Sequence, residues 1–283
     1  MKLVFDGDKF AKHYLQVTKS KDVLDANLSS WKSYFLKNLL KFIDKFQPTS
    51  TVLTLSSKPS WRKTICSDYK TTPTKLSKKS DFIDYRRYHQ VSEDFFKELK
   101  KSFNIGYLEV PTAESTDLSY LISEVSPEKT IIVSTSINIE QIVSSKVSVF
   151  NIVKNDFVRP LNAKKELLVR ILDGISSHNI HCVYAPRKNT KTLQKHLSEG
   201  LASLVSDEEL SKRLQKNKIL LDFNHIPMYI KKNVSEDLLK NLGDINSSVT
   251  IDFLSKYILD WNSKEATYRR ILESYDKRRM GTR

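Results

Sequence analysis

The stretch KLVF at residues 2–5 is a short apolar run that is followed directly by an acid, Asp6, and it sets the pattern for the first half of the chain. Four more runs of strand length, mostly rich in β-branched residues, follow at 51–55, 105–110, 130–135 and 147–153. Runs of this length and composition are typical of buried β-strands. The first half of the chain therefore predicts five short strands.

Helical patterns separate these runs. Aromatic and aliphatic residues recur at spacings of three or four over 28–46 and again over 82–103, which places one apolar face on each of two helices. Strands separated by helices are typical of βαβ units. We therefore expect an α/β fold with a mostly parallel central sheet and flanking helices on both faces.

The pattern changes after about residue 160. Only KILLDF at 218–223 is typical of a strand there. Helical patterns joined by short polar turns fill the rest, at 164–172, 190–197, 207–214, 235–242, 251–261 and 264–275. We expect an α/β domain over 1–160 and a mostly helical part over 161–283.

Composition excludes several classes of protein. Of 283 residues, 39% are hydrophobic, which is enough to bury a core. No run approaches the roughly 18 consecutive apolar residues of a membrane helix, and the opening MKLVFDGDKF has acids where a signal peptide is apolar, so we expect an intracellular protein. Two cysteines outside any CxxC spacing, and no P-loop or GxGxxG pattern, argue against zinc, redox and NTPase functions.

The charge is strongly positive, with 47 Lys plus Arg against 33 Asp plus Glu, a net +14. Two segments concentrate it: 58–79 holds seven basic residues and one acid, and 264–283 holds seven basic residues and three acids. An excess of this size favours an anionic partner, either nucleic acid or a membrane surface. The alternative is that lysine-rich faces only keep the chain solvated.

Polar side chains follow the predicted strands, where ligands of an open parallel sheet bind. Asp6 follows the first strand, Glu114 and Asp117 follow the third, and Ser136 and Asn138 follow the fourth. Carboxylates at several strand ends are typical of nucleases that hold two metal ions around a scissile phosphate. The sequence therefore indicates a nuclease-like site at this edge of the sheet.

Six motifs occur in the order and spacing of a known family: VFDGD (4–8), SWRKTICSDYK (60–70), AESTDLSYLI (113–122), IIVSTSINIEQI (131–142), DGISSHNI (173–180) and LLDFNHIP (220–227). Over nearly its whole length the chain resembles the 5′-to-3′ exonuclease and flap endonuclease family, most closely the RNase H of T-even bacteriophages. The resemblance implies a 5′-nuclease, PIN-like fold with a helical arch in the basic region at about 58–80. It also implies a helix-hairpin-helix-like module for duplex DNA in the helical C-terminal part, which ends in a basic tail.

The resemblance assigns Asp6, Glu114 and Asp117 to the metal site, but the family has five further acids that this chain lacks. Those positions hold Ser56 (or its neighbour Ser57), Thr116, Ser136, Asn138 and His178. Three acids can hold one Mg²⁺ weakly, whereas Ser, Asn and His are poor ligands for a second hard cation. We therefore expect weak or lost hydrolysis, binding that requires no cofactor, and a cleft that accepts phosphate directly.

Nucleic-acid contacts are expected in two segments. In the arch they are Lys58, Trp61, Arg62, Lys63, Tyr69 and Lys70, and in the hairpin module they are Arg187, Lys188, Lys191 and Lys195. Aromatic residues interleaved with cations suit base stacking and phosphate contact. The alternative is that Trp61 and Tyr69 are buried core anchors.

The resulting prediction is a nuclease-like protein that binds DNA junctions, flaps or RNA/DNA duplexes through phosphate contacts. The resemblance implies that it is phage-encoded and acts in the cytoplasm of the bacterial host. One alternative is an active Mg²⁺-dependent 5′-to-3′ exonuclease or RNase H of DNA replication, in which Glu140, Asp156 or Asp173 supplies a missing acid. Another is a non-catalytic subunit of a phage replication or transcription assembly, with the basic tail as its docking arm.

Overall fold

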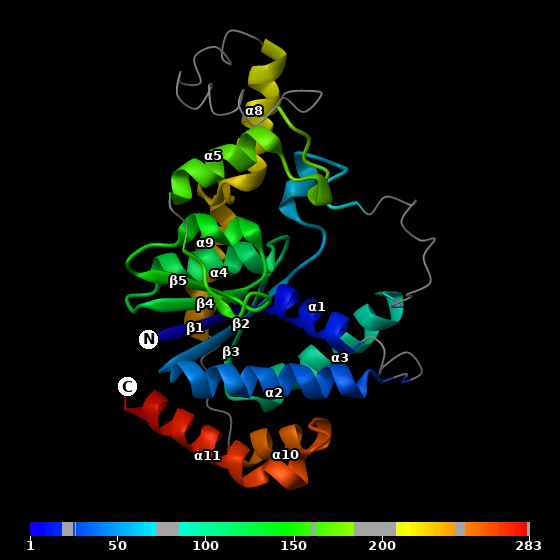
Figure 1. Ribbon diagram of the computed structural model, residues 1–283, viewed down its shortest axis with the longest axis vertical. Helices are drawn as coiled ribbons and strands as arrows, with labels where there is room; N and C mark the ends of the chain where they lie inside the picture. The colour runs from blue at the N-terminus through cyan, green and yellow to red at the C-terminus, as the bar shows by residue number, and fades with distance from the viewer. Residues whose placement is uncertain are drawn as a thin grey trace.

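A six-stranded sheet lies at the centre of the computed structural model, which describes residues 1–18, 25, 27–71, 85–159, 162–183, 208–240 and 247–281 (Figure 1). The strand order is β3-β2-β1-β4-β5-β6. The strands are β1 (Lys2–Asp6), β2 (Ser50–Ser56), β3 (Gly106–Val110), β4 (Thr130–Ser134), β5 (Val147–Asn151) and β6 (Asp156–Phe157). β1 to β5 are parallel, and β6 pairs antiparallel with β5. The mostly parallel sheet is confirmed, and β6 was not predicted.

Helices account for most of the remaining described residues. They are α1 (Gly7–Thr18), α2 (Ser29–Phe46), α3 (Tyr85–Ser102), α4 (Ser115–Val125), α5 (Ala163–Asp173), α8 (Glu208–Leu221), α9 (Met228–Lys240), α10 (Ser247–Tyr257) and α11 (Trp261–Met280), with 3₁₀ turns η1 (Trp61–Thr64), η3 (Ile137–Ile142), η4 (Ser176–His178) and η5 (Phe223–His225). The predicted helices overlap α2, α3, α5 and α8 to α11, except that 190–197 lies outside the described residues. α1 and α4 were not predicted. Within the described helices, none is both long and apolar enough to cross a membrane.

The strand predicted over 218–223 is wrong. α8 continues through this apolar run to Leu221, and η5 follows at Phe223. Leu214, Asn217 and Leu220 are buried at the three-residue spacing of one helix face. A short apolar run suits a buried strand and a buried helical turn equally well, and here the longer helical periodicity prevails.

Helices cover both faces of the sheet (Figure 1). Leu3 and Phe5 of β1 point into a core shared with α1, α2 and α3, whereas Val4 points into the opposite core beside α4 and α9. α10 and α11 pack outside α2, and α5 pairs with α8 at the other end of the molecule. The helices after residue 160 thus pack in three separate groups: α5 with α8, α9 against α4, and α10 with α11. The domain boundary near residue 160 stays a prediction.

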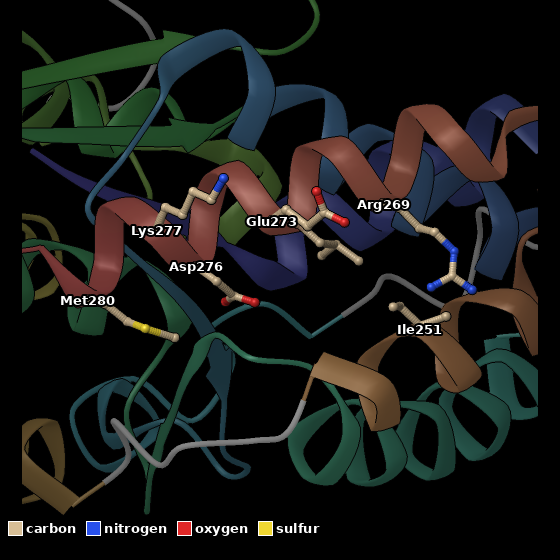
Figure 2. A pocket seen from close by; sticks show the side chains of 7 residues that line it. Ile251, Arg269, Glu273, Asp276, Lys277 and Met280 are labelled. Carbon is tan, nitrogen blue, oxygen red and sulfur yellow. The ribbon is translucent and has the colours of Figure 1, made fainter.

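A pocket of about 300 Å³ opens beside α11, where side chains of α10 and α11 meet (Figure 2). Its lining mixes aliphatic and charged side chains: Ile251, Arg269, Leu272, Glu273, Asp276, Lys277 and Met280. None of the site residues expected from the sequence lines it. The pocket is therefore separate from the predicted site at the strand ends.

α1 begins without a connecting turn, because β1 ends at Asp6 and the helix starts at Gly7. A Cβ atom on Gly7 would lie 2.4 Å from the carbonyl oxygen of Thr54 and 2.8 Å from the side chain of Leu55. Only a residue without a Cβ lets the helix approach β2 this closely. This contact fixes where the polar residues after Gly7 meet the edge of the sheet.

We expect Gly7→Ala to destabilise the protein by about 1–3 kcal/mol, because the added methyl group overpacks against backbone. Urea denaturation measures this change in the free energy of unfolding. Gly281→Ala is the matched control, since a Cβ there meets nothing closer than 3.5 Å, and its stability should stay within about 0.5 kcal/mol of the wild type. Equal stability of the two variants would contradict the close approach of α1 to β2.

Candidate functional site at the carboxyl ends of the strands

The three acids that the sequence assigns to one site lie at the carboxyl edge of the sheet. Asp6 ends β1, and its carboxylate contacts the first residue of α4, Ser115, and the last residue of β4, Ser134. Glu114 and Asp117 lie just before and within the first turn of α4. Parallel pairing explains the convergence, because the carboxyl ends of parallel strands share one edge.

Asp6 is fully buried and held by hydroxyl groups. Its two carboxylate oxygens accept hydrogen bonds from Ser115 Oγ and Ser134 Oγ, both at 2.6 Å. Burial raises the pKa of Asp6, while the charge of Lys9 and the two hydroxyl donors oppose that rise. Both oxygens therefore already have protein donors.

Asp117 is also fully buried, and it forms the strongest contact of the site. Arg62 Nη1 and Nη2 donate to the two carboxylate oxygens of Asp117 at 2.7 Å each, a bidentate pair. Trp61 Nε1 donates to the same carboxylate at 2.9 Å, and the backbone N–H of Glu114 donates at 3.2 Å. Arg62 is itself 1% exposed, and its Nε donates to the carbonyl oxygen of Leu220 at 2.7 Å. Bidentate, charge-assisted hydrogen bonds of this kind hold both partners in one geometry.

Glu114 lies between the buried pair and the solvent. Its Oε2 accepts hydrogen bonds from Lys70 Nζ at 2.8 Å and from the Tyr69 hydroxyl at 3.2 Å, and Arg62 Nη1 lies 3.5 Å away. Burial acts to raise the pKa of Glu114, but the charges of Arg62 and Lys70 outweigh it and lower that pKa to about 2. Glu114 is therefore ionised and paired with cations of the protein itself.

Comparison with known proteins supports this fold. No known family model and no curated protein sequence matches the chain. Among solved structures, the T5 5′-exonuclease with bound zinc ions shares 14% identity over 86% of this chain and 100% of its own, with a TM-score of 0.63. The T5 D15 protein co-crystallised with metal ions shares 14% identity over 96% and 98% of the two chains, with a TM-score of 0.59.

A complex of the bacteriophage T5 D15 flap endonuclease with DNA and metal ions also matches, at 14% identity over 97% of this chain and 99% of that chain, with a TM-score of 0.59. The chain has the 5′-nuclease fold. At this level of identity the likeness shows the fold alone, so the chemistry must be argued from the residues of this chain.

Two of the residues that the resemblance places at missing acids, Ser56 and Asn138, form side-chain hydrogen bonds in this structure. Ser56 Oγ accepts from the backbone N–H of Ser115 at 2.8 Å, and Asn138 Nδ2 donates to the carbonyl oxygen of Leu221 at 3.1 Å. Ser136 is buried, and its backbone N–H donates to Ser134 Oγ. Thr116 is buried in the first turn of α4. The side chain of Ser56 thus connects β2 to the start of α4, and that of Asn138 connects η3 to the end of α8.

His178 is the remaining residue that the resemblance places at the position of a missing acid. Its ring packs edge-on against Tyr69 at a centroid distance of 5.7 Å, and its Nδ1 is buried without a hydrogen-bond partner among the described residues. Burial, followed by the charges of Lys70 and Lys9, lowers the pKa of His178 to about 3. The imidazole is therefore neutral at physiological pH.

The arrangement of acids does not fit a pair of divalent metal ions. Within the described part of the chain, no group of three or more His, Cys, Asp or Glu side chains is placed to hold a metal. Both oxygens of Asp117 accept from Arg62, Glu114 accepts from Lys70, and Asp6 accepts from two hydroxyls. A metal ion would have to displace these donors. A single weakly held Mg²⁺ stays a prediction.

The three acids proposed for the active-nuclease alternative have other surroundings. Glu140 forms an ion pair with Arg170 at 2.7 Å, with both side chains less than 15% exposed. Asp156 is exposed on the short edge strand β6, and Asp173 ends α5. Neither contacts Asp6, Glu114 or Asp117 among the described residues.

The predicted nucleic-acid residues of the arch divide into two groups. Trp61, Arg62 and Tyr69 are at most 4% exposed and contact the acids, so in this structure they are not open to a nucleic acid, and the core-anchor alternative describes Trp61 and Tyr69. Lys58, Lys63 and Lys70 are exposed, although Lys70 also pairs with Glu114. The region predicted as an arch is described only as far as Thr71, and the residues predicted for the hairpin module, Arg187, Lys188, Lys191 and Lys195, lie outside the described residues.

Sequence reasoning missed Lys9 and Lys12 on α1. Both follow the first strand within the DGDKFAK stretch, and the charge of Lys9 reaches Asp6 and His178. Two lysines three residues apart, directly after a strand that ends in an acid, are the signal that could have found them.

We expect Arg62→Ala to destabilise the protein by about 3–5 kcal/mol, because it leaves the carboxylate of Asp117 buried without its cation. Chemical denaturation measures the free energy of unfolding. The control is Arg269→Ala, which breaks an exposed pair with Glu265 and should cost less than about 1 kcal/mol. Similar losses in both variants would show that Arg62 is not the central cation of the site.

We expect His178→Gln to reduce the pH dependence of stability between pH 6.5 and 3. The folded-state pKa of His178 is about 3, whereas an unperturbed histidine has a pKa of about 6.5. Between these two pH values the unfolded chain binds a proton that the folded chain does not. The wild type therefore loses stability as the pH falls, by up to about 1.4 kcal/mol per pH unit. Urea unfolding at pH 7, 5 and 4 gives the slope. Identical slopes for the variant and the wild type would contradict a buried, neutral histidine.

Proposed function

We propose that the protein binds branched or junction DNA through phosphate contacts and that its hydrolytic activity is weak or lost. The observation that carries this proposal is the bidentate contact of Arg62 with Asp117, because it occupies a carboxylate that a metal-dependent nuclease would need. Glu114 and Asp6 are similarly occupied by Lys70 and by two serine hydroxyls. The three remaining acids therefore have donors of their own.

Two-metal hydrolysis requires free anionic ligands. In such sites the cations lie about 3.5–4 Å apart and stabilise both the attacking and the leaving oxygen of the phosphate. A lysine or arginine can attract the phosphate, but it does not lower the pKa of a bound water as a metal ion does. Replacing mobile divalent ions with fixed side-chain cations thus favours binding over cleavage.

Three features support nucleic acid as the ligand. The net charge of +14 favours a polyanion. Lys58 and Lys63 are exposed on the segment that also carries Arg62 and Lys70 into the site. A structural neighbour, the T5 D15 flap endonuclease, is described in complex with DNA and metal ions.

The setting that we propose is a bacteriophage replication system in the cytoplasm of its bacterial host. The structural neighbours from bacteriophage T5 and the motif resemblance support it. Protein partners in a phage replication or transcription assembly remain part of the proposal, and the basic segment 264–283 is their candidate docking region.

A cleavage assay tests the catalytic half of the proposal. We expect a labelled 5′-flap DNA to give no more product with the wild type than with Asp6→Ala, in either Mg²⁺ or Mn²⁺. Metal-dependent product that Asp6→Ala abolishes would overturn the loss of hydrolysis and favour an active 5′ nuclease.

The same DNA in a gel-shift titration over a salt series tests the binding half. If phosphates dominate, log affinity falls linearly with log salt, by about 0.9 for each phosphate contact with duplex DNA. Binding that is absent, or that is insensitive to salt, would favour the subunit that acts only through protein partners.

A further inference from the structure

We propose that Lys9, Lys12 and Lys70 form a subsite that holds a phosphate group of the nucleic acid directly, with no divalent ion between the protein and the phosphate. The subsite lies beside the three acids, where α1 leaves the carboxyl end of β1. The inference rests on the proposed nucleic-acid binding. It adds that these three side chains attract the phosphate in place of a metal ion.

The first two lysines share one face of α1. Lys9 and Lys12 are three residues apart in this helix, so their side chains are neighbours on its surface. The close approach of Gly7 to β2 fixes the first turn, and hence where this face meets the site. Lys9 is half-buried, whereas Lys12 is exposed. The pair therefore reaches from the buried acid Asp6 to the solvent.

Lys70 completes the group from a distant segment. It follows η1, its Nζ contacts Glu114 at 2.8 Å, and its side chain is 33% exposed. The three ammonium groups lie close enough to influence one another: partial burial, followed by the charges of Lys9 and Lys70, lowers the pKa of Lys12. Like charges gathered in this way repel one another, and an anion among them relieves the repulsion.

Two of the three cations, Lys9 and Lys12, are also available. Within the described residues, Lys9 and Lys12 form no ion pair, whereas Lys70 pairs with Glu114. The nearest acid on α1 is Asp8, whose carboxylate accepts only a long hydrogen bond, 3.4 Å from the backbone nitrogen of Ser56. A phosphate can thus meet Lys9 and Lys12 without breaking an existing ion pair.

His178 adds a polar atom on the same side. Its carbonyl oxygen accepts a hydrogen bond from the backbone N–H of Lys70 at 3.0 Å, and the charges of Lys70 and Lys9 both reach its ring. Its buried Nδ1 has no protein partner among the described residues. Where an active site of this fold would present another carboxylate, this chain presents a neutral ring that does not repel phosphate.

The test is a fluorescence-anisotropy titration of labelled 5′-flap DNA by the full chain in EDTA. The variant Lys9→Ala/Lys12→Ala is compared with Lys129→Ala/Lys146→Ala, which removes the same charge from two exposed lysines just before β4 and β5, at the opposite edge of the sheet. We expect the first variant to bind at least about tenfold more weakly, with a salt slope smaller by about one to two, and the control to stay within about twofold of the wild type.

A second variant is expected to raise the affinity for DNA, so a variant that simply fails to fold cannot mimic its effect. Asp8→Asn removes the acid beside the lysines and should strengthen binding several-fold, while Lys9→Arg/Lys12→Arg should keep most of the affinity. Repeating the titration with 5′-phosphorylated and 5′-hydroxyl DNA identifies the phosphate. A loss confined to phosphorylated DNA assigns the terminal group, and equal losses assign an internal phosphodiester; both support the subsite.

Equal affinity of the two double-alanine variants would overturn the subsite while leaving the proposed binding function in place. An affinity that rises more than about tenfold when Mg²⁺ replaces EDTA would also overturn it, because a metal ion would then bridge to the phosphate. If the wild type binds no DNA under any of these conditions, the proposed function itself fails and the subsite with it.

Discussion

The contact between Arg62 and Asp117 is the interaction on which the rest of the site depends. One guanidinium group joins the first turn of α4, through Asp117, to the carboxyl end of α8, through the carbonyl oxygen of Leu220. Both charged groups are almost completely buried. A buried ion pair adds little net stability, since desolvation offsets the attraction, but its loss on one side is costly. It therefore specifies one arrangement of the two helices relative to the sheet.

Fixing the cations within the protein has consequences for chemistry. A divalent metal ion concentrates two charges on one atom and can activate a water molecule, whereas a guanidinium or ammonium group spreads or carries a single charge and mainly attracts anions. Arg62 and Lys70 already neutralise Asp117 and Glu114. Under our proposal, the carboxyl edge of the sheet keeps its attraction for phosphate and loses the means to break the phosphodiester bond.

Two uncharged side chains in the segment that follows β4 also have a structural effect. Asn138 and Gln141 both donate to the carbonyl oxygen of Leu221, and Gln141 accepts from the backbone N–H of Phe223. These hydrogen bonds satisfy polar groups at the end of α8, which a helix cannot satisfy internally. The side chains of Asn138 and Gln141 thus hold the end of α8 to the segment that follows β4.

The sequence by itself determined the α/β class, the parallel strands and the location of Asp6, Glu114 and Asp117 at one edge of the sheet, because periodicity is a local property of the backbone and parallel strands share a carboxyl edge. It did not determine that 218–223 ends a helix, nor that Trp61 is buried. Only the tertiary structure decided the partner of Asp117, since Arg62 lies 55 residues away along the chain. Ion pairing and burial depend on which distant segments of the chain come into contact, and a local sequence pattern does not specify those contacts.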